Sequence, residues 1–147
     1  MKRILLKKWE EISQNEVSAL CLDLKNMLQT PALIILTGDL GSGKTFLVDS
    51  FLKNNGQKQG AQSPTFSLLQ EHEDVLHGDF YRLKSSEEIE YLELPLLLEN
   101  KKLFFLEWGK DYLQAVVPYL EESVFFYEIE ILSVHETRSY FLYQSKK

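Results

Sequence analysis

Two short apolar runs, at residues 32–37 and 103–106, set the framework that the rest of the sequence completes. They read Ala-Leu-Ile-Ile-Leu-Thr and Leu-Phe-Phe-Leu and carry no charge, as is typical of strands buried on both faces of a parallel sheet. Residues 46–55, which follow the first run closely, contain no Gly or Pro and place their apolar side chains at helical spacing. The pattern therefore predicts a strand, a turn and a helix, with a second core strand later in the chain.

Weaker patterns predict the remaining elements. Residues 3–7 favour a short strand, and an apolar period of three to four residues predicts a helix from Trp9 to Leu28. In segment 123–132, apolar and polar residues alternate, which predicts a strand with one exposed face. The same reasoning predicts an antiparallel hairpin of strands at residues 65–71 and 75–81. It also predicts helical stretches at 85–100 and 110–116, and a closing pair of strands at 123–132 and 138–144.

The turn after the first core strand reads Gly38-Asp39-Leu40-Gly41-Ser42-Gly43-Lys44-Thr45, which fits G-x-x-x-x-G-K-T, the phosphate-binding loop of NTPases. Its place between a predicted strand and a predicted helix is the context that this motif requires. Small residues let backbone N–H groups curl around phosphate oxygens, and the helix N-terminus adds a positive dipole. The Lys44 ammonium would reach the β- and γ-phosphates, and the Thr45 hydroxyl would bind Mg²⁺.

Length and composition agree with a small NTPase. The chain has 147 residues, of which 44% are hydrophobic and 26% charged, as expected for one globular domain. We therefore predict an α/β fold with a single P-loop NTPase-like domain over residues 1–147. A mainly parallel core sheet would be flanked by helices, with antiparallel hairpins added to it.

Charge and cysteine content limit the kinds of binding partner and the cellular compartment to be expected. The net charge is −6 and basic residues form no long tract, which disfavours strong direct nucleic-acid binding by this chain alone. The single cysteine, Cys21, excludes an internal disulfide and is interpreted as a core residue of a helix in a reducing compartment. The first eight residues hold only three consecutive apolar ones, too few for a secretory signal, and no run could span a membrane. A cytoplasmic protein is expected.

Acidic residues near strand ends are candidates for the second half of an NTPase site, which needs another carboxylate near Mg²⁺ and a group that orients water. Glu107 directly follows the second core strand and would lie beside Thr45 if the two core strands are neighbours. Asp79, within His77-Gly78-Asp79-Phe80-Tyr81-Arg82, could polarise water or hold a metal-bound water. A surface Asp–Arg pair is the alternative. His77 has no Cys, His or Asp partners at metal-ligand spacing and is interpreted as structural.

A third segment, Ser63-Pro64-Thr65-Phe66, lies about twenty residues after the loop. In switch-type NTPases, a segment in such a position carries a Thr that senses the γ-phosphate through Mg²⁺. A plain turn into a strand is the alternative, and spacing alone does not separate the two.

Taken in order, these motifs resemble one family. The loop at 38–45, Ser63-Pro64-Thr65-Phe66, the block at 77–82 and Leu106-Glu107-Trp108 are together similar to the TsaE (YjeE) family, over nearly the whole chain. That family is the bacterial ATPase subunit of the machinery that makes the tRNA modification threonylcarbamoyladenosine. The resemblance implies a weak ATPase that uses ATP and Mg²⁺ and acts with the TsaB and TsaD proteins, of which TsaD transfers the threonylcarbamoyl group to adenosine of tRNA.

The resemblance also implies roles for individual residues. It makes residues 38–45 and Arg138 nucleotide contacts, and it places Trp108 near the site. The catalytic groups would be Lys44, Asp79 and Glu107. Thr45 and Glu107 would be the metal ligands, and Ser63 and Thr65 would be switch-like residues. One departure is Gly109-Lys110 after Glu107-Trp108, where a Pro is common in the family. This departure concerns the shape of the loop rather than the metal ligand.

Two other functions fit parts of the pattern. Asp79 and Arg82 have the D-x-x-R spacing with which some small P-loop kinases hold an acceptor, although no Arg-rich lid segment follows the second core strand. A non-catalytic module, in which ATP only fastens a partner surface, is the third possibility. GTP specificity is unsupported, because the chain contains no Asn-Lys-x-Asp segment.

Overall fold

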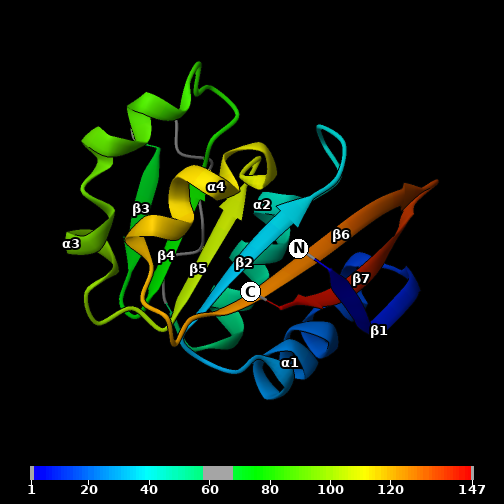
Figure 1. Ribbon diagram of the computed structural model, residues 1–147. Coiled ribbons are helices and arrows are strands. Elements are labelled where there is room, and N and C mark those ends of the chain that lie inside the picture. Colours follow the sequence, from blue (N-terminus) through cyan, green and yellow to red (C-terminus); the bar gives the residue numbers. More distant parts are fainter. Residues whose placement is uncertain (1, 58–67, 147) are drawn as a thin grey trace.

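The computed structural model describes residues 2–57 and 68–146, whose helices and strands alternate as in other α/β proteins (Figure 1). Short 3₁₀ helices, labelled η, accompany several of the α-helices. In chain order the described elements are β1 (Arg3–Ile12), η1 (Gln14–Glu16), α1 (Val17–Met27), β2 (Ala32–Thr37), α2 (Lys44–Asn54), β3 (Leu69–His72), β4 (Val75–Asp79), η2 (Ser86–Leu92), α3 (Leu94–Leu98), β5 (Leu103–Glu107), η3 (Lys110–Tyr112), α4 (Leu113–Val116), η4 (Val117–Tyr119), β6 (Phe125–Val134) and β7 (Thr137–Ser145).

The strands of the described residues form one seven-stranded sheet in the order β1-β7-β6-β2-β5-β4-β3. Its centre is parallel, because β2 pairs with β5 and β6, and β5 also pairs with β4. The edges are antiparallel, with β3 added to β4, and β7 lying between β6 and β1. The predicted fold class, a mainly parallel core with antiparallel hairpins in a P-loop NTPase-like arrangement, is thereby confirmed.

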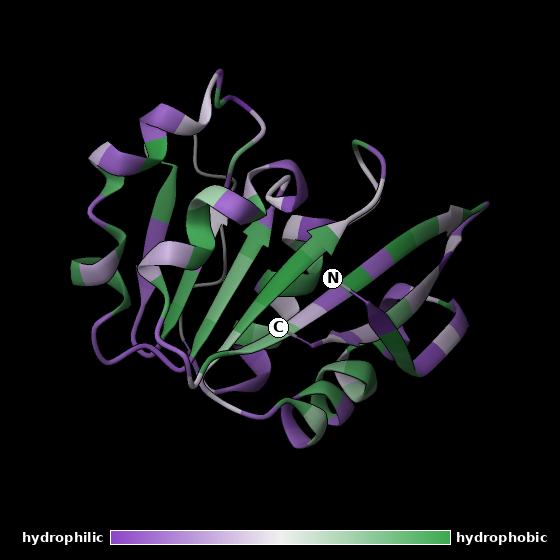
Figure 2. Cartoon of the chain, in the orientation of Figure 1, coloured by the Kyte–Doolittle hydropathy of each residue, from purple (hydrophilic) through white to green (hydrophobic). Residues whose placement is uncertain are grey.

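Helices cover both faces of the parallel centre, and its two middle strands, β2 and β5, are apolar up to their last residues (Figure 2). Ala32, Ile34 and Leu36 of β2 pack with α1 and α2, whereas Leu33 and Ile35 pack on the side of η2, α3 and α4. The same alternation puts Phe105 of β5 on the α2 side. Because side chains alternate along a strand, the side chain two residues after Phe105, at the carboxyl end of β5, also faces α2.

The predicted helix from Trp9 to Leu28 is wrong in its first third. β1 continues to Ile12, where it pairs with Arg138 of β7, and Trp9 is buried opposite Tyr140. Long-range pairing with β7 overrides the local helical period. The helical segment starts after Ser13, whose backbone N–H donates to the Glu16 carboxylate at 3.1 Å in a capping box.

Strand β6 also departs from its sequence pattern. Alternation predicted one exposed face, yet both Phe126 and Glu128 are buried. β6 lies between β2 and β7, and the apolar cluster on the α4 side extends over Phe126. Exposure begins only at Leu132, where β6 continues beyond the end of β2.

Other predictions have mixed outcomes. The antiparallel hairpin is confirmed for β3 and β4, whereas residues 65–67 of its first predicted strand lie outside the described residues. The helical stretch at 85–100 divides into η2 and α3 at Glu93, which has a left-handed φ of 55°. Cys21 is a buried residue of α1, as predicted. Within residues 2–57 and 68–146, no helix combines the length and the apolar character that crossing a membrane requires.

Candidate functional site

The phosphate-binding motif forms the connection between β2 and α2. Gly41 and Gly43 have φ values of 81° and 102°, in the left-handed region that favours glycine. At Gly38 a Cβ atom would lie 2.7 Å from the carbonyl oxygen of Ile131, so a side chain does not fit there. α2 begins directly afterwards at Lys44, so its free N–H groups point back into the loop. The arrangement suits an anion such as a phosphate.

Lys44 is 5% exposed and is anchored by the loop itself. Its Nζ donates to the carbonyl oxygens of Gly38 at 2.7 Å and Asp39 at 3.1 Å, and it lies 4.1 Å from the centre of the Trp108 ring. Burial lowers the pKa of Lys44, against the opposing effect of the nearby carboxylates, with Glu107 first. The ammonium therefore sits beside neutral acceptors, where an additional anion would be favourable.

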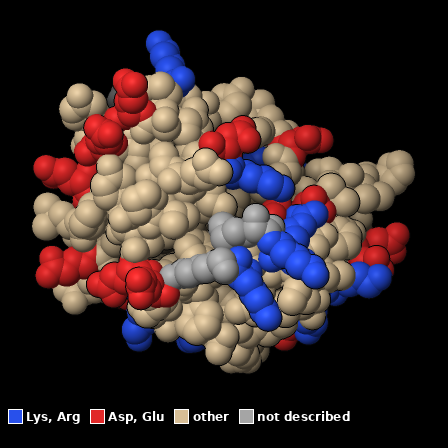
Figure 3. All heavy atoms as spheres, viewed as in Figure 1, with Lys and Arg blue, Asp and Glu red and all other residues tan. Residues whose placement is uncertain are grey.

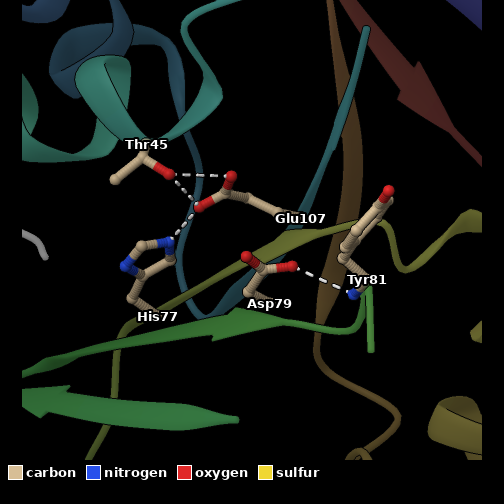
Figure 4. A network of polar contacts seen from close by, with 5 residues as sticks. All are labelled: Thr45, His77, Asp79, Tyr81 and Glu107. Atoms are coloured by element: carbon tan, nitrogen blue, oxygen red, sulfur yellow. Dashed lines mark hydrogen bonds and ion pairs between the residues drawn. The ribbon is translucent and has the colours of Figure 1, made fainter. Parts of the chain in front are cut away.

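Opposite the loop, Glu107 forms the centre of a polar network (Figure 4). The Thr45 hydroxyl donates to this carboxylate, with Oγ1 2.9 Å from both Oε1 and Oε2. On the other side, His77 Nε2 lies 2.5 Å from Glu107 Oε2. Glu107 is only 3% exposed and ends β5, which pairs directly with β2. The strand adjacency on which the sequence argument depended is present, and it brings Thr45 and Glu107 into contact.

Asp79 ends the neighbouring strand β4 and stands opposite Glu107 in the register of the two strands. Its Oδ1 accepts a hydrogen bond of 3.0 Å from the backbone N–H of Tyr81. Burial raises the pKa of Asp79, and the Glu107 charge adds to this effect, while the Tyr81 N–H opposes it. A carboxylate with a raised pKa beside a second carboxylate is a typical general-base candidate.

A cavity of about 420 Å³ joins these groups. Its lining includes both sides of the site, with Gly41, Gly43, Lys44 and Thr45 from the loop and α2, and Asp79, Glu107 and Trp108 from the strand ends. The tilted rings of Tyr81 and Trp108, 5.1 Å apart, form part of the wall. The hollow lies outside the carboxyl ends of parallel strands, where ligands bind in open α/β sheets.

The donor set suits a hard divalent cation. Thr45 Oγ1 and the Glu107 carboxylate are oxygen ligands of the kind that Mg²⁺ prefers. Among the described residues, no group of three or more His, Cys, Asp or Glu side chains could hold a metal by itself. A cation here would therefore need further oxygen ligands from water or from the phosphates of a nucleotide, as is usual for Mg²⁺.

Arg138, another predicted site residue, does not line the cavity of about 420 Å³. Arg138, on β7, donates from Nε to the carbonyl oxygen of Ser42 at 3.0 Å and so contacts the loop. It lines a separate cavity of about 180 Å³ beside Gly43, to which Glu107 and Asp79 do not contribute. Ser63 and Thr65 lie outside the described residues.

Sequence reasoning did not place His77 in this network. Its signal was present, because His77 and Asp79 are two residues apart on one strand and must project from the same face. A histidine that hydrogen-bonds a carboxylate thirty residues away has no metal-ligand spacing in the sequence. Trp108, with a left-handed φ of 57°, leads into Gly109, but the Glu107 carboxylate still faces Thr45.

Comparison with known proteins gives consistent matches. The family model described as "Threonylcarbamoyl adenosine biosynthesis protein TsaE" matches residues 12–140. The tRNA threonylcarbamoyladenosine biosynthesis protein TsaE of Rickettsia felis is 36% identical over 115 residues, which cover 75% of this chain and 67% of the relative. The protein of the same name from Bacillus subtilis is 29% identical over 106 residues, which cover 69% and 66%. The matched segments thus span about two thirds of these relatives.

A solved structure shows a similar fold. The crystal structure of Bacillus subtilis YdiB superposes with a TM-score of 0.60 and 20% sequence identity, covering 99% of this chain and 89% of that one. At this level of identity the likeness concerns the fold. It extends over the antiparallel strands as well as the parallel centre, because nearly the whole chain is covered.

Proposed function

This chain belongs to the TsaE family of tRNA threonylcarbamoyladenosine biosynthesis, and from that membership we propose that it is a Mg²⁺-dependent ATPase and an accessory subunit of the modification machinery. Its partners would be the TsaB and TsaD proteins, in the cytoplasm. The observation that carries the proposal is the contact of Thr45 Oγ1 with both carboxylate oxygens of Glu107 at 2.9 Å. It unites the end of the phosphate loop with an acid on the next strand.

Each residue has a role that follows from its surroundings. The loop N–H groups and the Lys44 ammonium would bind the phosphates, and Thr45 and Glu107 would hold Mg²⁺, which when bound neutralises charge on the phosphates. Asp79 would orient the attacking water and accept its proton, a task that its raised pKa favours. Arg138 would support the loop from its other side through Ser42. Switch-like roles for Ser63 and Thr65 rest on family membership alone.

Surface charge supports an accessory role. Figure 3 shows acidic side chains along the edge that carries η2 and α3, with Lys and Arg side chains near the middle of the same face. The chain carries a net charge of −6, so a continuous phosphate-binding face for tRNA is not the expected mode of contact. We propose that tRNA chemistry belongs to the partners and that this chain contributes nucleotide hydrolysis.

The test is a pull-down of the chain with TsaB and TsaD, with and without ATP and Mg²⁺, followed by measurement of ADP release from the assembled complex. We expect association that depends on ATP–Mg²⁺, and ADP formation that Lys44→Ala abolishes. Association without ADP formation would indicate a non-catalytic module. Phosphate transfer to a metabolite in a substrate screen would indicate a kinase, a function that family membership does not favour.

A further inference from the structure

We propose that His77 is a positioning residue that fixes the Glu107 carboxylate for cation binding. The inference rests on the proposed function, because it concerns the same Mg²⁺ site. It assigns a role to His77, which has none in the proposed function, and it explains a fully buried imidazole in the middle of β4, a strand that leads into the site.

The contact itself defines the role. His77 has no solvent exposure, and its Nε2 lies 2.5 Å from Glu107 Oε2. A carboxylate oxygen only accepts hydrogen bonds, so Nε2 carries the hydrogen and donates. Nδ1 has no hydrogen-bond partner among residues 2–57 and 68–146, so within this part of the chain Glu107 is the polar contact of the ring. Burying an imidazole with a single polar contact costs free energy. That cost is consistent with a functional role for the contact with Glu107.

Strand register explains why Glu107 needs such a support. His77 stands opposite Phe105, two residues before Glu107 on the same face of β5. The Glu107 side chain must therefore turn back along the sheet to meet the imidazole. Asp79 stands directly opposite Glu107, so the two negative charges repel each other. His77, two residues before Asp79 on the same strand, supplies a hydrogen-bond donor that stabilises this carboxylate despite that repulsion.

The two supports of Glu107 come from different parts of the fold. Thr45 lies on the first turn of α2, and His77 lies on β4 within the sheet. β4 is tightly packed here, since a Cβ at Gly78 would lie 2.8 Å from Leu69 Cδ2 and 2.9 Å from Leu106 Cδ1. The imidazole is thus attached to a closely packed strand, and it can define the carboxylate orientation even when the Thr45 oxygen is engaged by a cation.

The test compares variants that keep or remove the donor at position 77. His77→Leu removes it, and His77→Gln keeps an N–H close to the position of imidazole Nε2. His72→Leu is the matched control, because it removes an imidazole from the neighbouring strand that does not contact Glu107. For each protein we would measure Mn²⁺ affinity in the presence of a non-hydrolysable ATP analogue by electron paramagnetic resonance. Affinity for the analogue in EDTA and the melting temperature would be measured alongside.

We expect His77→Leu to weaken Mn²⁺ binding by about 10- to 100-fold, the usual effect of losing a hydrogen bond to a metal ligand. Affinity for the analogue in EDTA should stay within about two-fold, because the phosphate loop is untouched. His77→Gln should restore most of the Mn²⁺ affinity, and His72→Leu should resemble the wild type. A purely structural role would instead lower both affinities together, and Gln would not restore them selectively.

Three results would overturn the inference. Wild-type Mn²⁺ affinity in a folded His77→Leu variant would do so while leaving the proposed function intact. A wild-type protein without Mn²⁺–nucleotide binding would overturn the proposed function and this inference with it. If the Leu variant does not fold, the ¹⁵N–¹H spectrum of the wild-type imidazole decides, because a hydrogen on Nδ1 instead of Nε2 contradicts the donor role.

Discussion

Two buried glutamates flank β2, one on each neighbouring strand, and they are satisfied in different ways. Glu128 on β6, 8% exposed, accepts from the Thr37 hydroxyl at 2.8 Å and pairs with Arg3 at 3.0 Å and Lys110 at 3.4 Å. Its counterpart at the end of β5, Glu107, is 3% exposed and contacts a hydroxyl and an imidazole. In the part of the chain that the structure describes, no Lys or Arg nitrogen lies within ion-pair distance of Glu107.

The difference shows how a structural carboxylate can be told from a site carboxylate. A buried charge is costly unless opposite charges and hydrogen bonds compensate it. Glu128 receives that compensation from its own chain. Glu107 instead stands opposite another acid, Asp79, beside a loop built for phosphates. Lys44 attracts the Glu107 carboxylate without forming an ion pair with it, and a divalent cation with its nucleotide would supply the closer positive charge.

The largest expected effect separates the two glutamates by activity. Glu107→Gln keeps the shape of the side chain but removes its charge, so ADP formation in the complex with TsaB and TsaD should fall by about 100-fold or more. Glu128→Gln should change this rate by less than about three-fold, because its partners belong to the other face of the sheet. Equal rates in both variants would remove the distinction. Circular dichroism spectra would show that both proteins are folded.

A second comparison uses ligand stabilisation. At an ATP-analogue concentration about 100 times the dissociation constant, binding with Mg²⁺ should stabilise the fold by about 2.7 kcal/mol. For a chain of this size that corresponds to a rise in melting temperature of roughly 5–10 °C. Glu128→Gln should keep the whole Mg²⁺-dependent rise, and Glu107→Gln should lose most of it. A rise that does not depend on Mg²⁺ in the wild type would contradict the assigned ligands.

Stability without ligand should show the opposite order. Glu128→Gln weakens two ion pairs, but Arg3 and Lys110 are exposed and can be hydrated, so we expect a loss of about 1–2 kcal/mol. Glu107→Gln should be neutral or stabilising, since it relieves repulsion with Asp79. Urea unfolding of both variants measures this difference. A larger loss for Glu107→Gln would mean that Glu107 is a structural group.

The smallest effect concerns pH. Burial raises the pKa of Asp79 in the folded state, so the folded protein binds this proton more tightly than the unfolded chain. The resulting stabilisation is complete below the ordinary Asp pKa and is lost as pH rises through the raised value. Asp79→Asn should therefore reduce the decline in melting temperature between acidic and neutral pH, while ADP formation falls. An unchanged dependence of the melting temperature on pH would show that folding does not raise the pKa of Asp79.

Much of the site could be predicted because its parts are adjacent in sequence. The loop at 38–45 specifies its own geometry through small residues between a strand and a helix, and it folds as the motif requires. Glu107 could be placed only on the condition that its strand neighbours β2, which the register confirms. His77 was missed, since its partner lies thirty residues away and only strand pairing brings the two together.

The errors share one cause. Trp9 to Ile12 looks helical by period, and β6 looks half-exposed by alternation, yet both are decided by strands that follow or precede them by many residues. Periodicity reports which side chains are apolar, and it does not report how many neighbours a strand will have. Pairing with β7 makes Trp9 to Ile12 a strand instead of a helix. The position of β6 between β2 and β7 buries the face that alternation predicted to be exposed.

The sequence by itself determined the phosphate loop, the two buried strands and the family, because these depend on residues close together in the chain. The sequence also proposed Glu107 as the acid of the site, but only the tertiary structure showed that Glu107 contacts Thr45 and that Glu128 is paired with Arg3 and Lys110. The physical reason is that the cost of a buried charge depends on the groups that surround it in space. Those groups come from segments that are distant in the sequence, and local sequence patterns do not predict which of these segments come together.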